Sequence, residues 1–198
     1  MARSADPALR PQLLAKAVEH CLARGVSDLS LRPLASALGV SPRTLLYHFE
    51  SKDRLISAIV DETQRRQRAL LLAWLERRPG YDVRSQIIGA WLFLRAPRHE
   101  RFLRFAFELH ALALRDRRRF GAVAARMAAD SADVFARVLA DGGIPASDAR
   151  QAAVLLAAVA RGLLFEALAG GDRASADRAF RTFVAALELP APRSALRS

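Results

Sequence analysis

The segment from residue 30 to residue 52 constrains the fold of this chain more than any other stretch. Apolar residues recur at i, i+3, i+4 and i+7 over residues 31–38, which predicts one buried face of a short helix. Ser30 occupies the N-cap position of that helix, and Gly39 can end it in a left-handed conformation. A second short helix is predicted to begin at Pro42. Two short helices joined by a tight turn form a helix-turn-helix.

The second helix of this motif has a sharply defined start and two different faces. Ser41 is a favoured N-cap residue, and Pro42 suits the first helical position because its φ is already set. Leu45 and Phe49 are four residues apart and face the interior together. The side chains left for solvent or a partner are those of Arg43, Thr44, Tyr47 and His48. A third helix is predicted to begin at Lys52, which follows Ser51 in the N-cap position.

The run GVSPRTLLYHFESKDRL, preceded by PLASAL, resembles the DNA-binding domain of the TetR (tetracycline-repressor-like) family of bacterial regulators. The pattern of that family is roughly T-x-x-x-I-A-x-x-x-G-V-S-x-G-T-L-Y-x-H-F-x-S-K-x-x-L. Matching positions are Leu34-Ala35, Gly39-Val40-Ser41, Thr44-Leu45, His48-Phe49, Ser51-Lys52 and Leu55. Two positions depart from it: Arg43 replaces the usual Gly, and Leu46 replaces the usual Tyr, with the aromatic residue moved to Tyr47.

The composition agrees with an all-α fold. Hydrophobic residues make up 52% of the 198 residues, Ala and Leu dominate, and no stretch alternates with period two. The resemblance implies a three-helix helix-turn-helix DNA-binding domain at residues 1–55. It also implies a larger helical ligand-binding and dimerisation domain at residues 56–198, with about nine helices in all.

The DNA-reading residues follow from the motif. Arg43 lies in the first turn of the second helix, where a helix-turn-helix meets base edges, and an arginine can bridge O6 and N7 of guanine. A phosphate contact is the alternative role of Arg43. Lys52 stands at a helix N-terminus, which favours a phosphate, and Tyr47 and His48 are assigned mainly to the DNA backbone. The full predicted set is Ser30, Arg32, Ser41, Pro42, Arg43, Thr44, Tyr47, His48 and Lys52.

Beyond the motif, the apolar pattern predicts a long helix from Lys52 to about Arg77 and helices near 83–95, 97–114, 116–141, 147–169 and 174–187. The charged runs QRRQR (64–68) and RDRRR (115–119) are interpreted as solvated faces. The two last helices are rich in alanine and more apolar than a solvated surface. In the TetR family the last two helices form a four-helix bundle with a second subunit, and the resemblance implies the same homodimer here.

A ligand site is predicted in the C-terminal domain for a small apolar effector molecule. Aromatic residues cluster there, whereas only one phenylalanine lies in the helix-turn-helix. Ordinary core packing is the alternative role for each of them, and pairing with Glu166 is the alternative for the arginine. The predicted ligand contacts are Trp91, Phe102, Phe105, His110, Met127 and Arg161.

The remaining features exclude classes of function rather than suggest them. The net charge of +11 suits a nucleic-acid partner but is spread along the chain, so it does not locate a site. The single cysteine, Cys21, suits a reducing compartment. No signal peptide and no apolar run of bilayer length is seen, so a cytoplasmic protein without a membrane partner is expected. No catalytic constellation, metal site or cofactor motif was found, and no enzymatic activity is expected.

These observations predict a TetR-like transcriptional regulator. It is expected to be a repressor that binds a palindromic double-stranded DNA operator as a homodimer and is released by its effector. Two alternatives stay open: a ligand-independent architectural or silencing DNA-binding protein, and a helical enzyme or lipid carrier that retains the N-terminal fold.

Overall fold

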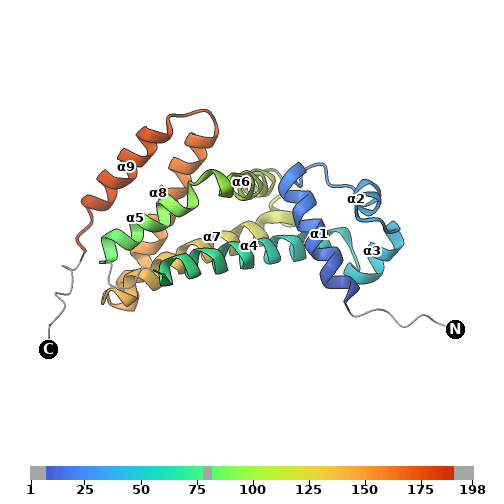
Figure 1. Cartoon of the computed structure of the whole chain (residues 1–198), viewed down its shortest axis with the longest axis horizontal. Helices are drawn as coiled ribbons and strands as arrows, with labels where there is room; N and C mark the ends of the chain where they lie inside the picture. Colours follow the sequence, from blue (N-terminus) through green and yellow to red (C-terminus); the bar gives the residue numbers. More distant parts are fainter. Residues whose placement is uncertain (1–7, 78–81, 190–198) are drawn as a thin grey trace. The chain divides into compact units, whose positions relative to one another are not determined.

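The structure is a computed structural model that describes residues 8–77 and 82–189. These residues form nine α-helices and one 3-10 helix, and no strand occurs among them, so the all-α prediction is confirmed (Figure 1). The helices are α1 (Leu9–Arg24), α2 (Leu31–Leu38), α3 (Pro42–Phe49), α4 (Lys52–Glu76), α5 (Val83–Leu94), η1 (Pro97–His99), α6 (Glu100–Arg115), α7 (Arg117–Asp141), α8 (Ala146–Leu168) and α9 (Arg173–Ala185).

The helix ends fall where the local sequence dictates. Gly39 adopts the left-handed conformation that ends α2, with φ 73° and ψ 29°. Asp82 and Asp172 cap α5 and α9, because their carboxylates accept hydrogen bonds from backbone N–H groups of the first turn. The predicted break at Pro79-Gly80 and the predicted flexible tail from Pro190 lie outside the described residues, as does most of the N-terminal arm.

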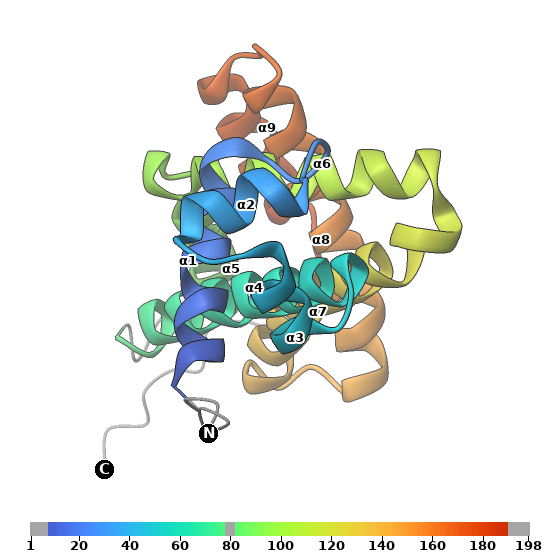
Figure 2. The same ribbon diagram turned by 90° about the vertical axis from the view of Figure 1, so that its right-hand side faces the viewer.

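The described chain divides into two compact units. The first unit joins the chain up to Gln67 with Arg101–Ala125, so it contains α1, α2, α3, the first part of α4, most of α6 and the start of α7. Within it α2 contacts both α1 and α3, and Figure 2 shows these short helices beside α1. Its fully buried side chains include Val18, Leu34, Leu45, Leu55, Ile59 and Leu109.

The second unit joins Arg68–Glu100 with the chain from Arg126 onward. It contains the end of α4, α5, the rest of α7, α8 and α9, and both α5 and α8 contact α9. Its fully buried side chains include Ile87, Trp91, Leu139, Leu156 and Phe180. The contacts therefore divide the chain within α4 and α7. The boundary expected at residue 55, between a DNA-binding and a ligand-binding domain, concerns function and stays a prediction.

The helix α8 has an unusual surface. It spans 23 residues, and by length and composition alone it could cross a membrane, a property that core helices of soluble proteins share. Apolar side chains at 154, 155 and 165 are each at least half exposed, with Ala158 and Gly162 also on the surface between them. These five residues follow helical spacing and form one stripe, which we call the α8 stripe.

Candidate nucleic-acid interface

The turn between α2 and α3 is built as predicted. The Ser41 Oγ accepts a hydrogen bond from the Thr44 backbone N–H at 3.0 Å, and Pro42 opens the helix. The two hydroxyl oxygens of Ser41 and Thr44 are 2.8 Å apart, so these side chains are also bonded to each other. Because the cap closes the first turn of α3, the backbone direction of Arg43 is fixed relative to the buried residues behind it.

The helix α3 buries one face and presents the other. Leu45 is fully buried and Phe49 is 3% exposed, whereas Tyr47 is 71% exposed. The side chain of Arg43 is exposed and has no partner among the described residues. Leu46, which stands where the family pattern has Tyr, is 39% exposed, so the departure from the pattern lies on the outer face and leaves the core intact.

Two neighbouring rings of α3, those of Tyr47 and His48, contact each other. The ring of His48 meets the ring of Tyr47 nearly at a right angle, with centroids 5.1 Å apart. Arg10 of α1 donates a hydrogen bond from its Nε to the His48 backbone oxygen at 3.1 Å, and its guanidinium lies over the Phe49 ring. The first turn of α1 is therefore fastened to the end of α3. No local sequence pattern predicts this contact, because the two residues are 38 positions apart.

A sharp turn connects α3 to α4. Glu50 has φ 64° and ψ −46°, and the Ser51 N–H donates to the Phe49 oxygen at 2.7 Å, which makes a γ-turn of the rare, strained kind. The Ser51 Oγ then accepts from the Arg54 N–H at 3.1 Å and caps α4, as predicted. Lys52 is half-buried, and its ammonium has no partner in the described part of the chain.

The N-terminus of α2 differs from the prediction. Ser30 has the extended backbone of an N-cap residue, but its side chain makes no capping hydrogen bond. The Ser30 backbone oxygen accepts the first helical bond from Leu34, so the position is right and only the side-chain role is wrong. Both Ser30 and Arg32 are exposed at this end of the motif.

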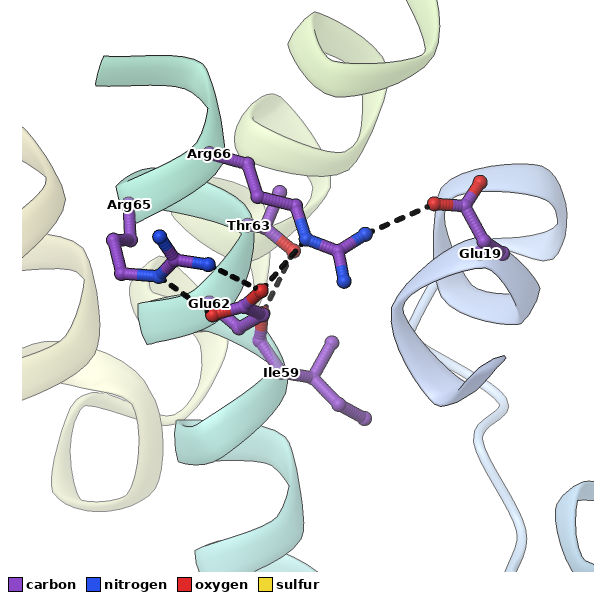
Figure 3. Close-up of polar contacts among 6 residues, drawn as sticks. All are labelled: Glu19, Ile59, Glu62, Thr63, Arg65 and Arg66. Carbon is purple, nitrogen blue, oxygen red and sulfur yellow. Dashed lines mark hydrogen bonds and ion pairs between the residues drawn. The ribbon is translucent and has the colours of Figure 1, made fainter. Parts of the chain in front are cut away.

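The basic run in α4 is the predicted solvated face only in part, because Arg65 is exposed whereas Arg66 is half-buried in ion pairs. Figure 3 shows Arg65 and Arg66 converging on Glu62. Arg65 makes two hydrogen bonds of 2.8 Å to its carboxylate, and Arg66 makes one of 2.7 Å and reaches Glu19 of α1 at 3.1 Å. Hydrogen bonds from Arg65, and then from Arg66, lower the pKa of Glu62 from 4.5 to about 2. The run therefore ties α1 to α4, a link that one helix's pattern cannot reveal.

The six predicted ligand contacts divide between the two compact units. Phe102, Phe105 and His110 belong to the first unit, whereas Trp91, Met127 and Arg161 belong to the second. Trp91, Phe105 and Met127 are at most 2% exposed.

Of the two polar members of this set, His110 has a buried atom without a hydrogen-bond partner, and Arg161 has no ion pair among the described residues. The His110 Nδ1 donates to the Ala106 oxygen at 2.7 Å, because a carbonyl only accepts, and its Nε2 is buried without a partner among the described residues. Arg161 is half-buried, burial lowers its pKa, and it has no ion pair among those residues, Glu166 included.

One surface pocket of about 160 Å³ lies in the second unit. It is lined by Leu72, Leu75, Glu76, Gln86, Arg137, Val138 and Asp141. None of the six predicted ligand contacts is among them, and the volume is smaller than that of a pocket that encloses a drug-sized molecule. Among the described residues no group of three or more His, Cys, Asp or Glu side chains is arranged to hold a metal ion.

Comparison with known proteins identifies the N-terminal motif. Residues 13–59 match the sequence model of the bacterial regulatory proteins of the tetR family. These residues contain most of α1, the whole of α2 and α3, and the start of α4. No curated protein matches the sequence.

Solved structures match nearly the whole chain. A TetR-family transcriptional regulator from Cytophaga hutchinsonii is 14% identical, with a TM-score of 0.75 over 96% of this chain and 100% of its own. A putative TetR-family regulator from Rhodococcus sp. is 23% identical, with a TM-score of 0.71 over 89% and 96%. A putative transcriptional regulator from Saccharomonospora viridis, in complex with choline, is 20% identical, with a TM-score of 0.66 over 91% and 95%. The chain therefore carries the sequence motif of the tetR family of bacterial regulatory proteins at residues 13–59, and it shares the fold of solved TetR-family transcriptional regulators.

Proposed function

We propose that this protein is a transcriptional repressor that binds a palindromic operator as a homodimer and leaves it when a small effector binds. The observation that carries the proposal is the outer face of α3, where Arg43 and Tyr47 are exposed beside a capped, rigid first turn. A helix held this way can enter the major groove without first ordering its backbone. The DNA contacts would be Ser30, Arg32, Ser41, Pro42, Arg43, Thr44, Tyr47, His48 and Lys52.

Within this set the roles differ. Arg43 has no partner inside the described chain, so its guanidinium is available to bridge a guanine in the groove. The Thr44 and Ser41 hydroxyls already bond each other, which leaves their remaining lone pairs and donor for a phosphate. Lys52, unpaired at the start of α4, is assigned to a phosphate.

The α8 stripe supports the homodimer. An apolar stripe of this length is unfavourable in water, and small residues at 158 and 162 allow another helix to approach closely. A second copy is the occupant that the family resemblance implies, and obligate dimers bury roughly 2,000 Å² or more. A dimer also supplies two copies of α3, which an operator with two half-sites about 34–36 Å apart requires.

The effector site of this proposal would lie within residues 56–198. Two alternative candidate groups lie in different compact units: the buried Nε2 of His110 in the first unit, or the half-buried, unpaired guanidinium of Arg161 in the second. The choline complex of the Saccharomonospora viridis regulator supports a small-molecule ligand for this fold. An effector would release DNA by binding more tightly to a conformation of the dimer in which the distance between the two α3 helices does not fit the operator.

The experiment that tests the function is genome-wide recovery of the DNA bound by the full-length protein, followed by binding of the purified protein to the recovered duplex. We expect a palindromic site and release by a compound connected with the neighbouring genes. Binding that no apolar or cationic compound releases would favour the ligand-independent silencing protein, and recovery of no specific duplex would contradict both readings.

A further inference from the structure

The carboxylate of Glu108 in α6 holds the loop between α1 and α2. Its Oε2 accepts a hydrogen bond from the Val26 backbone N–H at 2.9 Å, and its Oε1 accepts one from the Ser27 N–H at 2.6 Å. Both oxygens are therefore bound to consecutive amides of a loop more than 80 positions away in the sequence. Charge-assisted bonds of this kind are stronger than those between neutral groups.

The loop is shaped around this carboxylate. Gly25 has φ 81°, a conformation that residues with a side chain rarely adopt, and a Cβ added there would lie 2.7 Å from Oε2 and 2.8 Å from Oε1 of Glu108. The backbone conformation thus favours glycine, and a larger residue would also displace the Glu108 carboxylate from the position in which it binds the loop. Beside it, burial first and the charge of Glu108 second raise the pKa of Cys21 to about 12, so the thiol stays neutral next to the carboxylate.

The loop leads directly into the helix-turn-helix. Val26 and Leu29 are buried, and the Leu29 N–H donates a hydrogen bond to the Val26 oxygen. The loop from Val26, which Glu108 binds, to Ser30 is therefore short and rigid. Ser30 then starts α2, which contacts α3. The pair of short helices is therefore held at two places, by Arg10 at the end of α3 and by Glu108 at the entrance to α2.

We propose that Glu108 is a positioning residue for DNA reading, which sets the orientation of α2 and α3 from α6 through two backbone amides. It touches no DNA in this scheme and acts only through the loop. The inference rests on the proposed DNA-binding function. It makes α6 part of the DNA-reading apparatus, although α6 lies outside residues 13–59, which match the family's sequence model.

The test compares Glu108→Gln and Glu108→Asp with Asp28→Asn. Glutamine keeps the shape of the side chain but presents one acceptor and one donor to two N–H groups, whereas aspartate keeps the charge and falls one methylene short. Asp28 lies in the same loop, is exposed and has no side-chain partner among the described residues, so Asp28→Asn controls for the loss of one negative charge.

Three measurements are made on the full-length protein. The first is hydrogen exchange at the Val26 and Ser27 amides, which we expect to accelerate roughly tenfold or more in both Glu108 variants and not in Asp28→Asn. The second is affinity for the recovered operator and for a scrambled duplex of equal length. We expect operator affinity to fall roughly tenfold while the scrambled duplex binds as before. The third is the salt dependence, which should not change because no phosphate contact is lost.

The outcomes separate positioning from simple stabilisation. Faster exchange with selective loss of operator affinity supports the proposal, and the same result for Glu108→Asp shows that geometry rather than charge is responsible. Faster exchange with unchanged operator affinity, or equal losses on both duplexes, overturns it. If the unmodified protein binds no operator, the proposed function fails instead of this inference alone.

Discussion

The indole ring of Trp91 lies nearly parallel to the phenyl ring of Phe180, with centroids 4.5 Å apart and an angle of 13° between the planes. The Trp91 Nε1 also donates to the Asp177 Oδ1 at 2.8 Å, and the same carboxylate oxygen lies 2.7 Å from the Arg95 Nε. Trp91 was predicted as an effector contact, with core packing as the alternative. Because one ring face and the N–H are both engaged between α5 and α9, its contacts favour the packing role.

Replacing Trp91 by Phe should therefore act on stability. The variant keeps an aromatic ring against Phe180 but loses the N–H, so the free energy of unfolding should fall by about 1–2 kcal/mol. Urea denaturation followed by circular dichroism measures this value. A variant that unfolds like the parent but binds the effector more weakly would instead make Trp91 an effector contact.

Arg43→Ala and Lys52→Ala should both weaken DNA binding, in distinguishable ways. Losing Lys52 in both subunits should lower affinity on all sequences and flatten the salt slope by ~2, close to one per lost phosphate contact. Losing Arg43 should relax the base preference at one symmetric pair of positions in the operator. Each bidentate contact to guanine contributes ~1–3 kcal/mol of discrimination against the wrong base. Selection from a randomised operator checks this. If Arg43→Ala keeps the full sequence preference and only the salt dependence of its affinity is reduced, Arg43 contacts a phosphate instead.

Ala158→Arg should produce monomers, because it places a long charged side chain in the middle of the α8 stripe. Ala129→Arg, on an exposed position of α7, is the matched control and should leave the oligomeric state unchanged. Leu164 is unsuitable for this purpose, since it is only 5% exposed within its own chain and an arginine there would disrupt the fold. Sedimentation at micromolar concentration decides the question, and a monomeric parent protein would contradict the proposed dimer.

Glu62→Gln should reduce stability at neutral pH by about 1 kcal/mol, a modest value because Arg65 is largely exposed. The folded-state pKa of Glu62, about 2, lies below its ordinary value of 4.5. Its contribution is therefore complete above pH 4.5 and is lost as the pH falls from there toward about 2. Unfolding curves of parent and variant should converge over this range. A difference that persists unchanged at pH 2 would show that the effect is not electrostatic.

Glu50→Gly should stabilise the protein by about 1 kcal/mol, because glycine adopts the positive φ of this γ-turn without strain. The exposed ion pair between Glu50 and Arg54 contributes little against this. Glu50→Ala is the control: it removes the same ion pair, keeps the strain, and should not raise the melting temperature. Equal melting temperatures for both variants would mean that the strain relieved by glycine does not exceed the unfolded-state entropy that glycine adds.

The sequence allowed the helices and the face of α3 to be predicted because both depend on local patterns. Ser41, Pro42 and Gly39 act within one or two turns of their own positions, and apolar spacing identified Leu45 and Phe49 as buried. The contacts of Arg10, Arg66 and Glu108 were missed because each joins segments far apart in the chain. A charged residue on a helix is predicted to be solvated from its local pattern, because only tertiary packing brings a distant partner to it.

The presence of α6 in the first unit has a consequence for how the protein folds. Leu109 is fully buried within the unit that contains α1 to α3, and Glu108 binds the loop that enters α2; both belong to a segment synthesised long after the helix-turn-helix. The DNA-reading end therefore cannot be completed until α6 has emerged and docked. A fragment cut after α4 would lack this support. Contacts of such large sequence separation also slow folding, so maturation of the DNA-binding end should lag behind synthesis of its own sequence.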